Sequence, residues 1–124
     1  MTNLDAMIAK YVSSWNEPDP EARRRVIDEV WAADGVYRNA TTEFAGRAGI
    51  EAAVAEAYGA FSAKGYVFKL AAVDRNHDAI RYRWEMVGVT GGQADSIGTH
   101  VAIVGTNGRL VSDHQFIDKP PSAG

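Results

Sequence analysis

The segment GTHVAIVGTNGRLVSDHQFID, residues 98–118, places one histidine and one aspartate in two apolar runs. The two runs flank Thr-Asn-Gly-Arg, and His100 and Asp113 each lie within one of them. A histidine held beside a carboxylate has a fixed tautomer, which suits general acid–base chemistry. The first question is whether these two side chains share a pocket or belong to a solvated hairpin.

The Asn-Gly pair between alternating apolar segments predicts a tight β-hairpin. With Asn107 and Gly108 as the two central turn residues, His100 faces Gln115 across the hairpin. His100 and Asp113 are then diagonal neighbours on one face, with Cβ atoms roughly 5–8 Å apart. A shift of one residue would place them on opposite faces.

Hydrophobicity does not show which face of this hairpin is buried, because each face carries the same number of apolar residues. We expect Val111 on the face of His100 and Asp113, and Leu110 on the other. A half-exposed, chemically idle cross-strand pair remains the alternative to an acid–base centre.

The rest of the chain predicts helices first and strands afterwards. Apolar residues at helical spacing indicate three helices, over residues 3–16, 20–34 and 48–63. Alternation then indicates strands over residues 66–73 and 79–89, and a short strand is expected at 35–39, followed by a loop at 41–47. This order predicts an α+β fold in which the helices cover one face of a curved antiparallel sheet.

Length and composition limit the possible functions. The chain has 124 residues, a net charge of −3 and no cysteine. We expect one domain over residues 1–118 and a disordered tail over 119–124. A nucleic-acid partner, a membrane span, a signal peptide and a metal site are not expected, and a cytoplasmic location is.

The strand over residues 79–89 has two rows of side chains. Ile80, Tyr82, Trp84 and Met86 form an apolar row, whereas Arg83 and Glu85 lie on the opposite face. In one interpretation the apolar row is core and the charged row is solvated. In the other, Arg83 and Glu85 line a cavity and the Trp84 row lies in a dimer contact.

The chain up to Asp118 resembles the nuclear transport factor 2-like superfamily, in particular its SnoaL-like and ketosteroid-isomerase-like branches. The resemblance is carried by AKYVSSWN, VWAADGVYRNA, FAGRAGIEAAV, RYRWE and GTNGRLVSDHQFID. It implies a cone of three helices in a strongly bent antiparallel sheet, with an apolar cavity at the open end. It also implies a homodimer formed through the outer surface of the sheet.

Similarity to ketosteroid isomerase places Tyr11 at that family's oxyanion-hole tyrosine and His100 at its protonated aspartic acid. It places Asn39 at the family's carboxylate base, and an amide cannot take a proton from carbon. Asn39 therefore argues against the same steroid isomerisation.

Similarity to limonene-epoxide hydrolase matches Tyr37-Arg38-Asn39 to that family's water-holding Tyr-x-Asn. Arg83 and Glu85 match its Arg-x-Asp, with glutamate in place of aspartate. The remaining aspartate of that family falls on Gln115.

Similarity to the SnoaL-type polyketide cyclases fits the hairpin, because that family has a histidine and an acid–base aspartate on its last two strands. It implies cofactor-free chemistry on a small apolar molecule, of the cyclase or isomerase type. Asp113 would be the base and His100 its partner. The substrate would be bound by Tyr11, Asn39, Arg83, Glu85 and Gln115. The alternatives are an epoxide hydrolase and a non-catalytic domain for ligand binding or dimerisation.

Overall fold

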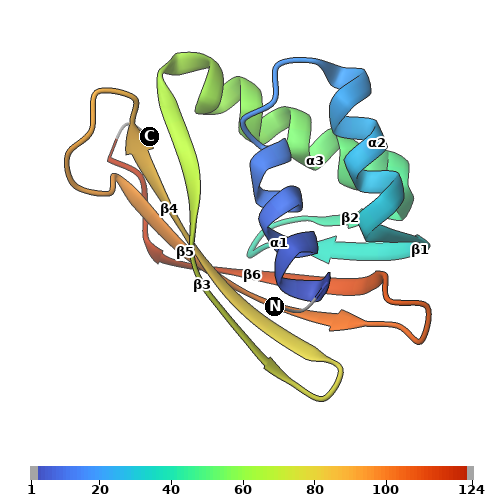
Figure 1. Ribbon diagram of the computed structural model, residues 1–124. Helices are drawn as coiled ribbons and strands as arrows, with labels where there is room; N and C mark the ends of the chain where they lie inside the picture. The colour runs from blue at the N-terminus through green and yellow to red at the C-terminus, as the bar shows by residue number, and fades with distance from the viewer. Residues whose placement is uncertain (1–2, 123–124) are drawn as a thin grey trace.

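The computed structural model describes residues 3–122, which form three α-helices, one 3₁₀ turn and one sheet of six strands (Figure 1). The helices are α1 (Asn3–Ser14), α2 (Pro20–Val30) and α3 (Gly46–Ala60), and η1 (Ser62–Lys64) is the 3₁₀ turn. The strands are β1 (Trp31–Arg38), β2 (Glu43–Ala45), β3 (Tyr66–Asn76), β4 (Ala79–Gly88), β5 (Ser96–Val104) and β6 (Leu110–Lys119).

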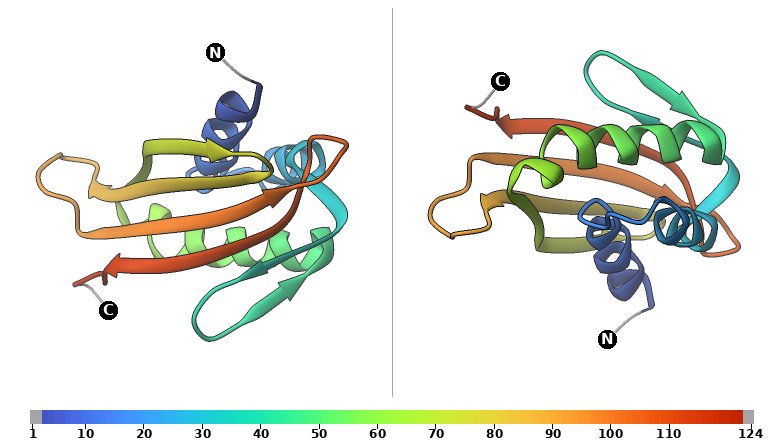
Figure 2. Two further views of the ribbon diagram at one scale, coloured as in Figure 1. Left: turned by 90° about the horizontal axis from the view of Figure 1, so that it is seen from below. Right: turned by 90° about the horizontal axis from the view of Figure 1, so that it is seen from above.

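The sheet has the order β2-β1-β6-β5-β4-β3, and all three helices lie against one of its faces (Figure 2). It is strongly curled but not closed, since β2 and β3 are its two edges. The predicted α+β fold is confirmed, with one difference: β1 runs parallel to β6. No hairpin joins these two strands, so nothing in the local sequence determines their relative direction.

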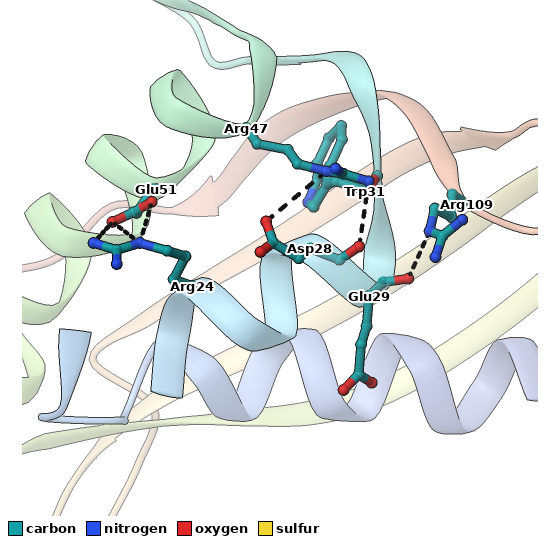
Figure 3. Close-up of polar contacts among 7 residues, drawn as sticks. All are labelled: Arg24, Asp28, Glu29, Trp31, Arg47, Glu51 and Arg109. Atoms are coloured by element: carbon teal, nitrogen blue, oxygen red, sulfur yellow. Dashed lines mark hydrogen bonds and ion pairs between the residues drawn. The ribbon is translucent and has the colours of Figure 1, made fainter. Parts of the chain in front are cut away.

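The junction of α2 and β1 differs from the prediction, because the helix ends at Val30 and the strand begins at Trp31, whereas the sequence predicts a helix that continues to Asp34. The backbone of Trp31 is extended and its side chain is fully buried. Arg47 Nε donates to the carbonyl of Trp31 at 3.0 Å, and Arg109 Nε donates to the carbonyl of Glu29 at 3.3 Å (Figure 3). These arginines satisfy carbonyls at the helix end, where helical partners are missing.

Two further segments differ from their predicted boundaries. The expected loop at 41–47 contains β2, which pairs with β1, and α3 begins at Gly46. Of the expected tail, Lys119 ends β6 and Ser122 donates a hydrogen bond to Asp95. The end of that tail, residues 123–124, lies outside the described residues.

The register of the final hairpin is the predicted one around His100 and Asp113. His100 pairs with Gln115, and Asp113 pairs with Ala102. Both His100 and Asp113 are buried, with 1% and 0% of their surface exposed. The pair therefore points into the molecule, toward the helices.

The turn itself differs from the predicted two-residue turn, because its loop is longer and a bulge restores the register. The Gly105 N–H donates to the Arg109 carbonyl at 2.8 Å, so three residues lie between them. Gly108 takes a left-handed φ of 81°, which glycine adopts without steric penalty. A register shift between Ile103 and Val104 then compensates for the longer loop.

The same irregularity changes the faces of two residues next to the turn. Leu110 is completely buried and Val111 is only partly buried, the reverse of the expectation. Because Val111 is the extra residue of the bulge, alternation is interrupted there and resumes before Asp113.

Candidate active site

A cavity of about 270 Å³ lies between the sheet and helices α1 and α3. Aromatic rings form much of its wall: those of Tyr11, Trp15, Tyr37, Phe44, Phe61, Phe68, Trp84 and His100. Among residues 3–122, the lining includes one acidic side chain, Glu56, and no lysine or arginine. Such a wall suits an apolar molecule with few polar groups.

His100 lines this cavity, whereas its predicted partner Asp113 lies behind it, fully buried and not among the lining residues. A tyrosine of β4 completes the pair. His100 Nδ1 lies 2.9 Å from Asp113 Oδ2. The Tyr82 hydroxyl donates to the same Oδ2 at 2.7 Å and lies 2.9 Å from His100 Nδ1. Tyr82 is opposite His100 in the β4–β5 pairing, and its side chain is fully buried.

The second nitrogen of His100 also has a partner. Trp84, two residues along β4 from Tyr82, donates its indole N–H to His100 Nε2 at 2.9 Å. Trp84 is 4% exposed and lines the cavity. The imidazole is therefore held at both nitrogens.

The two oxygens of Asp113 have different surroundings. Oδ2 is hydrogen-bonded to Tyr82 and His100, whereas Oδ1 has no hydrogen-bond partner among residues 3–122. Burying a carboxylate oxygen without a partner is unfavourable, and such atoms in folded proteins call for an explanation.

Three buried tyrosines lie near this carboxylate, and the pKa values of all three are strongly raised. Burial, followed by the negative charge of Asp113, raises the pKa values of Tyr11, Tyr37 and Tyr82 well above 10. For Tyr82, its hydrogen bond to Asp113 raises the pKa further. Tyr11 and Tyr37 also line the cavity. Their raised pKa values mean that both phenols are neutral.

Of the five residues expected to bind substrate, three line the cavity and two do not. Tyr11, Asn39 and Gln115 line the cavity, as a substrate-binding role requires. The Asn39 side-chain oxygen is already occupied, because it accepts hydrogen bonds from the backbone N–H groups of Thr41 and Thr42.

The expectation that Arg83 and Glu85 line the cavity is wrong. Arg83 is exposed, Glu85 is partly exposed, and neither is among the lining residues. The alternating row that contains Tyr82 and Trp84 points inward instead. The structure therefore agrees with the interpretation in which the apolar row is core, because exposed charges keep their hydration.

The family of the chain follows from a comparison of its sequence with known families. The family model described as the SnoaL-like domain matches residues 8–112. The chain belongs to the SnoaL-like domain family. No protein with curated annotation matches it.

Solved structures agree with this assignment. This SnoaL-like domain is similar to a candidate isomerase of the SnoaL-like family from Agrobacterium tumefaciens, at 30% identity and a TM-score of 0.84. That match covers 95% of this chain and 99% of the other. A candidate polyketide cyclase from Sinorhizobium meliloti shares the fold, with 19% identity, a TM-score of 0.69 and coverage of 94% and 95% of the two chains.

Sequence reasoning missed two partners of the pair in this SnoaL-like domain, Tyr82 and Trp84. The sequence places both in an apolar row and indicates no polar role for them. A signal was present, because a buried tyrosine hydroxyl or indole N–H usually finds a hydrogen-bond partner. The β4–β5 register was still needed to identify His100 as that partner.

Residues 3–122 show neither a metal centre nor a membrane-spanning helix. No group of three or more histidine, cysteine, aspartate or glutamate residues there is placed to hold a metal ion. Within the same residues, no helix combines the length and apolar character needed to cross a membrane.

Proposed function

We propose that this SnoaL-like domain is an acid–base enzyme that takes a carbon-bound proton from a small, mostly apolar carbonyl compound. Asp113 is the base. The observation that carries the proposal is the difference between its two carboxylate oxygens: Oδ2 is hydrogen-bonded to Tyr82 and His100, and Oδ1 has no partner within the described part of the chain. A carboxylate held in this way is oriented and poorly solvated, which favours proton transfer.

The hydroxyls of Tyr11 and Tyr37 are suited to the other half of the reaction. When Oδ1 removes a proton from the carbon next to a carbonyl, negative charge develops on the carbonyl oxygen as an enolate forms. Neutral donors aimed at that oxygen stabilise it. The raised pKa values of Tyr11 and Tyr37 keep both phenols protonated, and both line the cavity.

The enolate has two outcomes that need no metal or cofactor. Return of the proton from Asp113 to a different carbon gives an isomer. Attack of the enolate carbon on a second carbonyl of the same molecule forms a ring, and the proton on Asp113 then passes to the new alkoxide. The similarity to the Agrobacterium isomerase supports this class of reaction.

Deuterium exchange tests the proposal without knowledge of the natural substrate. A panel of small aromatic and alicyclic ketones is incubated with the protein in D₂O, and loss of the α-proton is followed by ¹H NMR. We expect exchange of at least one ketone to fall about a hundredfold or more in Asp113→Asn. Glu85→Gln, on the other face of the sheet, is the matched control and should exchange as the wild type does.

Two results would overturn this assignment. Equal exchange by the wild type and Asp113→Asn, for every ketone, would indicate a ligand-binding domain without catalysis. Loss of exchange in Glu85→Gln with Asp113→Asn unaffected would move the chemistry to the residues matched to the epoxide hydrolases.

We also propose that the protein forms a homodimer through the outer face of the sheet. Val101 of β5 and Phe116 of β6 are exposed by 37% and 56% and belong to adjacent strands. Large exposed apolar side chains that lie close together are typical of an interaction surface.

A further inference from the structure

We propose that Trp84 is a positioning residue that holds His100 as the neutral imidazole with its proton on Nδ1. In this tautomer His100 donates to Asp113 and aims the carboxylate, and it does not exchange protons with the substrate. The benefit to catalysis rests on the proposed function, whereas the tautomer follows from the hydrogen bonds alone.

The contact between Trp84 and His100 decides the state of Nε2. An indole N–H is a donor only, and it lies 2.9 Å from His100 Nε2. Nε2 must therefore present its lone pair. An imidazolium, with protons on both nitrogens, would place two donors against each other at this distance. Because a neutral imidazole carries one proton, that proton is on Nδ1.

The contacts of Nδ1 independently indicate that the imidazole proton is on Nδ1. Nδ1 lies 2.9 Å from Asp113 Oδ2 and 2.9 Å from the Tyr82 hydroxyl. The single Tyr82 proton is directed to Oδ2, at 2.7 Å. Without a proton on Nδ1, its lone pair would face those of the carboxylate in a site where each side chain is at most 1% exposed.

Gly98 makes the indole position possible. It pairs with Trp84 across β4 and β5, and the indole lies over its Cα. A Cβ at Gly98 would lie 2.8 Å from Trp84 Nε1 and closer still to two ring carbons. The missing side chain of Gly98 therefore allows the indole to lie against β5, where its N–H reaches His100.

These contacts act in sequence. Gly98 leaves space for the indole, and Trp84 donates a hydrogen bond to Nε2. His100 then has a single N–H, on Nδ1, which it donates to Asp113. Two donors on Oδ2 then restrict rotation of the carboxylate, so that Oδ1 keeps a fixed direction.

The tautomer can be measured directly by ¹H–¹⁵N correlation NMR of the imidazole rings in ¹⁵N-labelled protein near neutral pH. The chain has three histidines. The His100 signals are assigned by elimination with His77→Gln and His114→Gln, which alter exposed side chains. We expect the wild-type pattern of a protonated Nδ1 and an unprotonated Nε2. An imidazolium, or a proton on Nε2, would overturn the proposal with no variant needed.

Variants show whether Trp84 is the cause. Trp84→Phe keeps a ring but removes the donor, so we expect the His100 Nε2 signal to shift toward the protonated form. Gly98→Ala should shift it in the same direction by displacing the indole. Trp31→Phe is the control, because Trp31 is equally buried and its Nε1 has no hydrogen-bond partner among residues 3–122. An unchanged His100 spectrum in folded Trp84→Phe would contradict the assigned role.

The exchange assay separates this inference from the proposed function. Trp84→Phe should lower kcat for exchange roughly ten- to a hundredfold, the range found when groups that orient metal-bound histidines are removed, with a smaller change in KM. The expected spectra together with no exchange by the wild type would refute the proposed function and leave the tautomer standing. Exchange by the wild type together with an imidazolium at His100 would support the proposed function and refute the assigned tautomer.

Discussion

At the residue scale, the tyrosines around Asp113 are the groups whose ionisation the fold resists most. Tyr11, Tyr37 and Tyr82 are buried beside a carboxylate, so a phenolate at any of them would be poorly hydrated and repelled. The unfolded chain exposes the same phenols to water, where they titrate near pH 10. Folding and phenol ionisation are therefore linked.

The sign of this linkage predicts alkaline unfolding. Because the folded-state pKa values are raised, their stabilising effect is complete below pH 10 and is lost as the pH rises beyond it. Each such tyrosine lowers the free energy of unfolding by about 1.4 kcal/mol per pH unit above pH 10. Urea unfolding of the wild type and Tyr82→Phe at several pH values should show slopes that differ by about this amount. Equal slopes would mean that Tyr82 ionises in the folded protein as readily as in the unfolded one.

At the element scale, the sequence predicts the features that residues close in the chain determine, such as the hairpin register. It does not predict the features that depend on pairing between distant segments. The Asn-Gly turn predicts a hairpin that places His100 and Asp113 on one face, and this holds despite a longer loop because a bulge compensates. The sequence does not determine which face of β4 points inward, since Arg83 and Glu85 could pair with each other within a cavity. Only the sheet pairing decides that question.

The same distinction explains the incomplete prediction of the site. His100, Asp113 and Gln115 belong to one hairpin, so local sequence relates their positions. Tyr82 and Trp84 join them across a loop of seven residues, 89–95, whose length does not determine the strand register. The polar contacts that orient the imidazole therefore could not be predicted from the sequence.

At the scale of the whole molecule, one sheet has two different faces. The inner face, covered by three helices, carries the cavity and the buried carboxylate. The outer face carries exposed Val101 and Phe116. Because the two faces use alternate residues of the same strands, changes on the outer face leave the inner side chains in place.

The proposed dimer gives a prediction at this scale. Replacing both Val101 and Phe116 with glutamate should convert a dimer to a monomer in sedimentation velocity, because like charges would then oppose each other in a desolvated contact. Val89→Glu is the matched control, since Val89 is 65% exposed but lies after the end of β4. A wild type that sediments as a monomer, or a double variant that stays dimeric, would contradict the proposed interface.

The most direct test of the central claim is the free energy of unfolding of Asp113→Asn, measured by urea titration at neutral pH. If Asp113 is a buried carboxylate facing only neutral partners, the amide removes an unpaired charge and stabilises the protein by about 1–3 kcal/mol. Asp74→Asn, in an exposed ion pair with Arg81, should change stability by less than about 1 kcal/mol. A loss of about 3–5 kcal/mol in Asp113→Asn would instead indicate that the carboxylate neutralises a buried imidazolium and serves the structure.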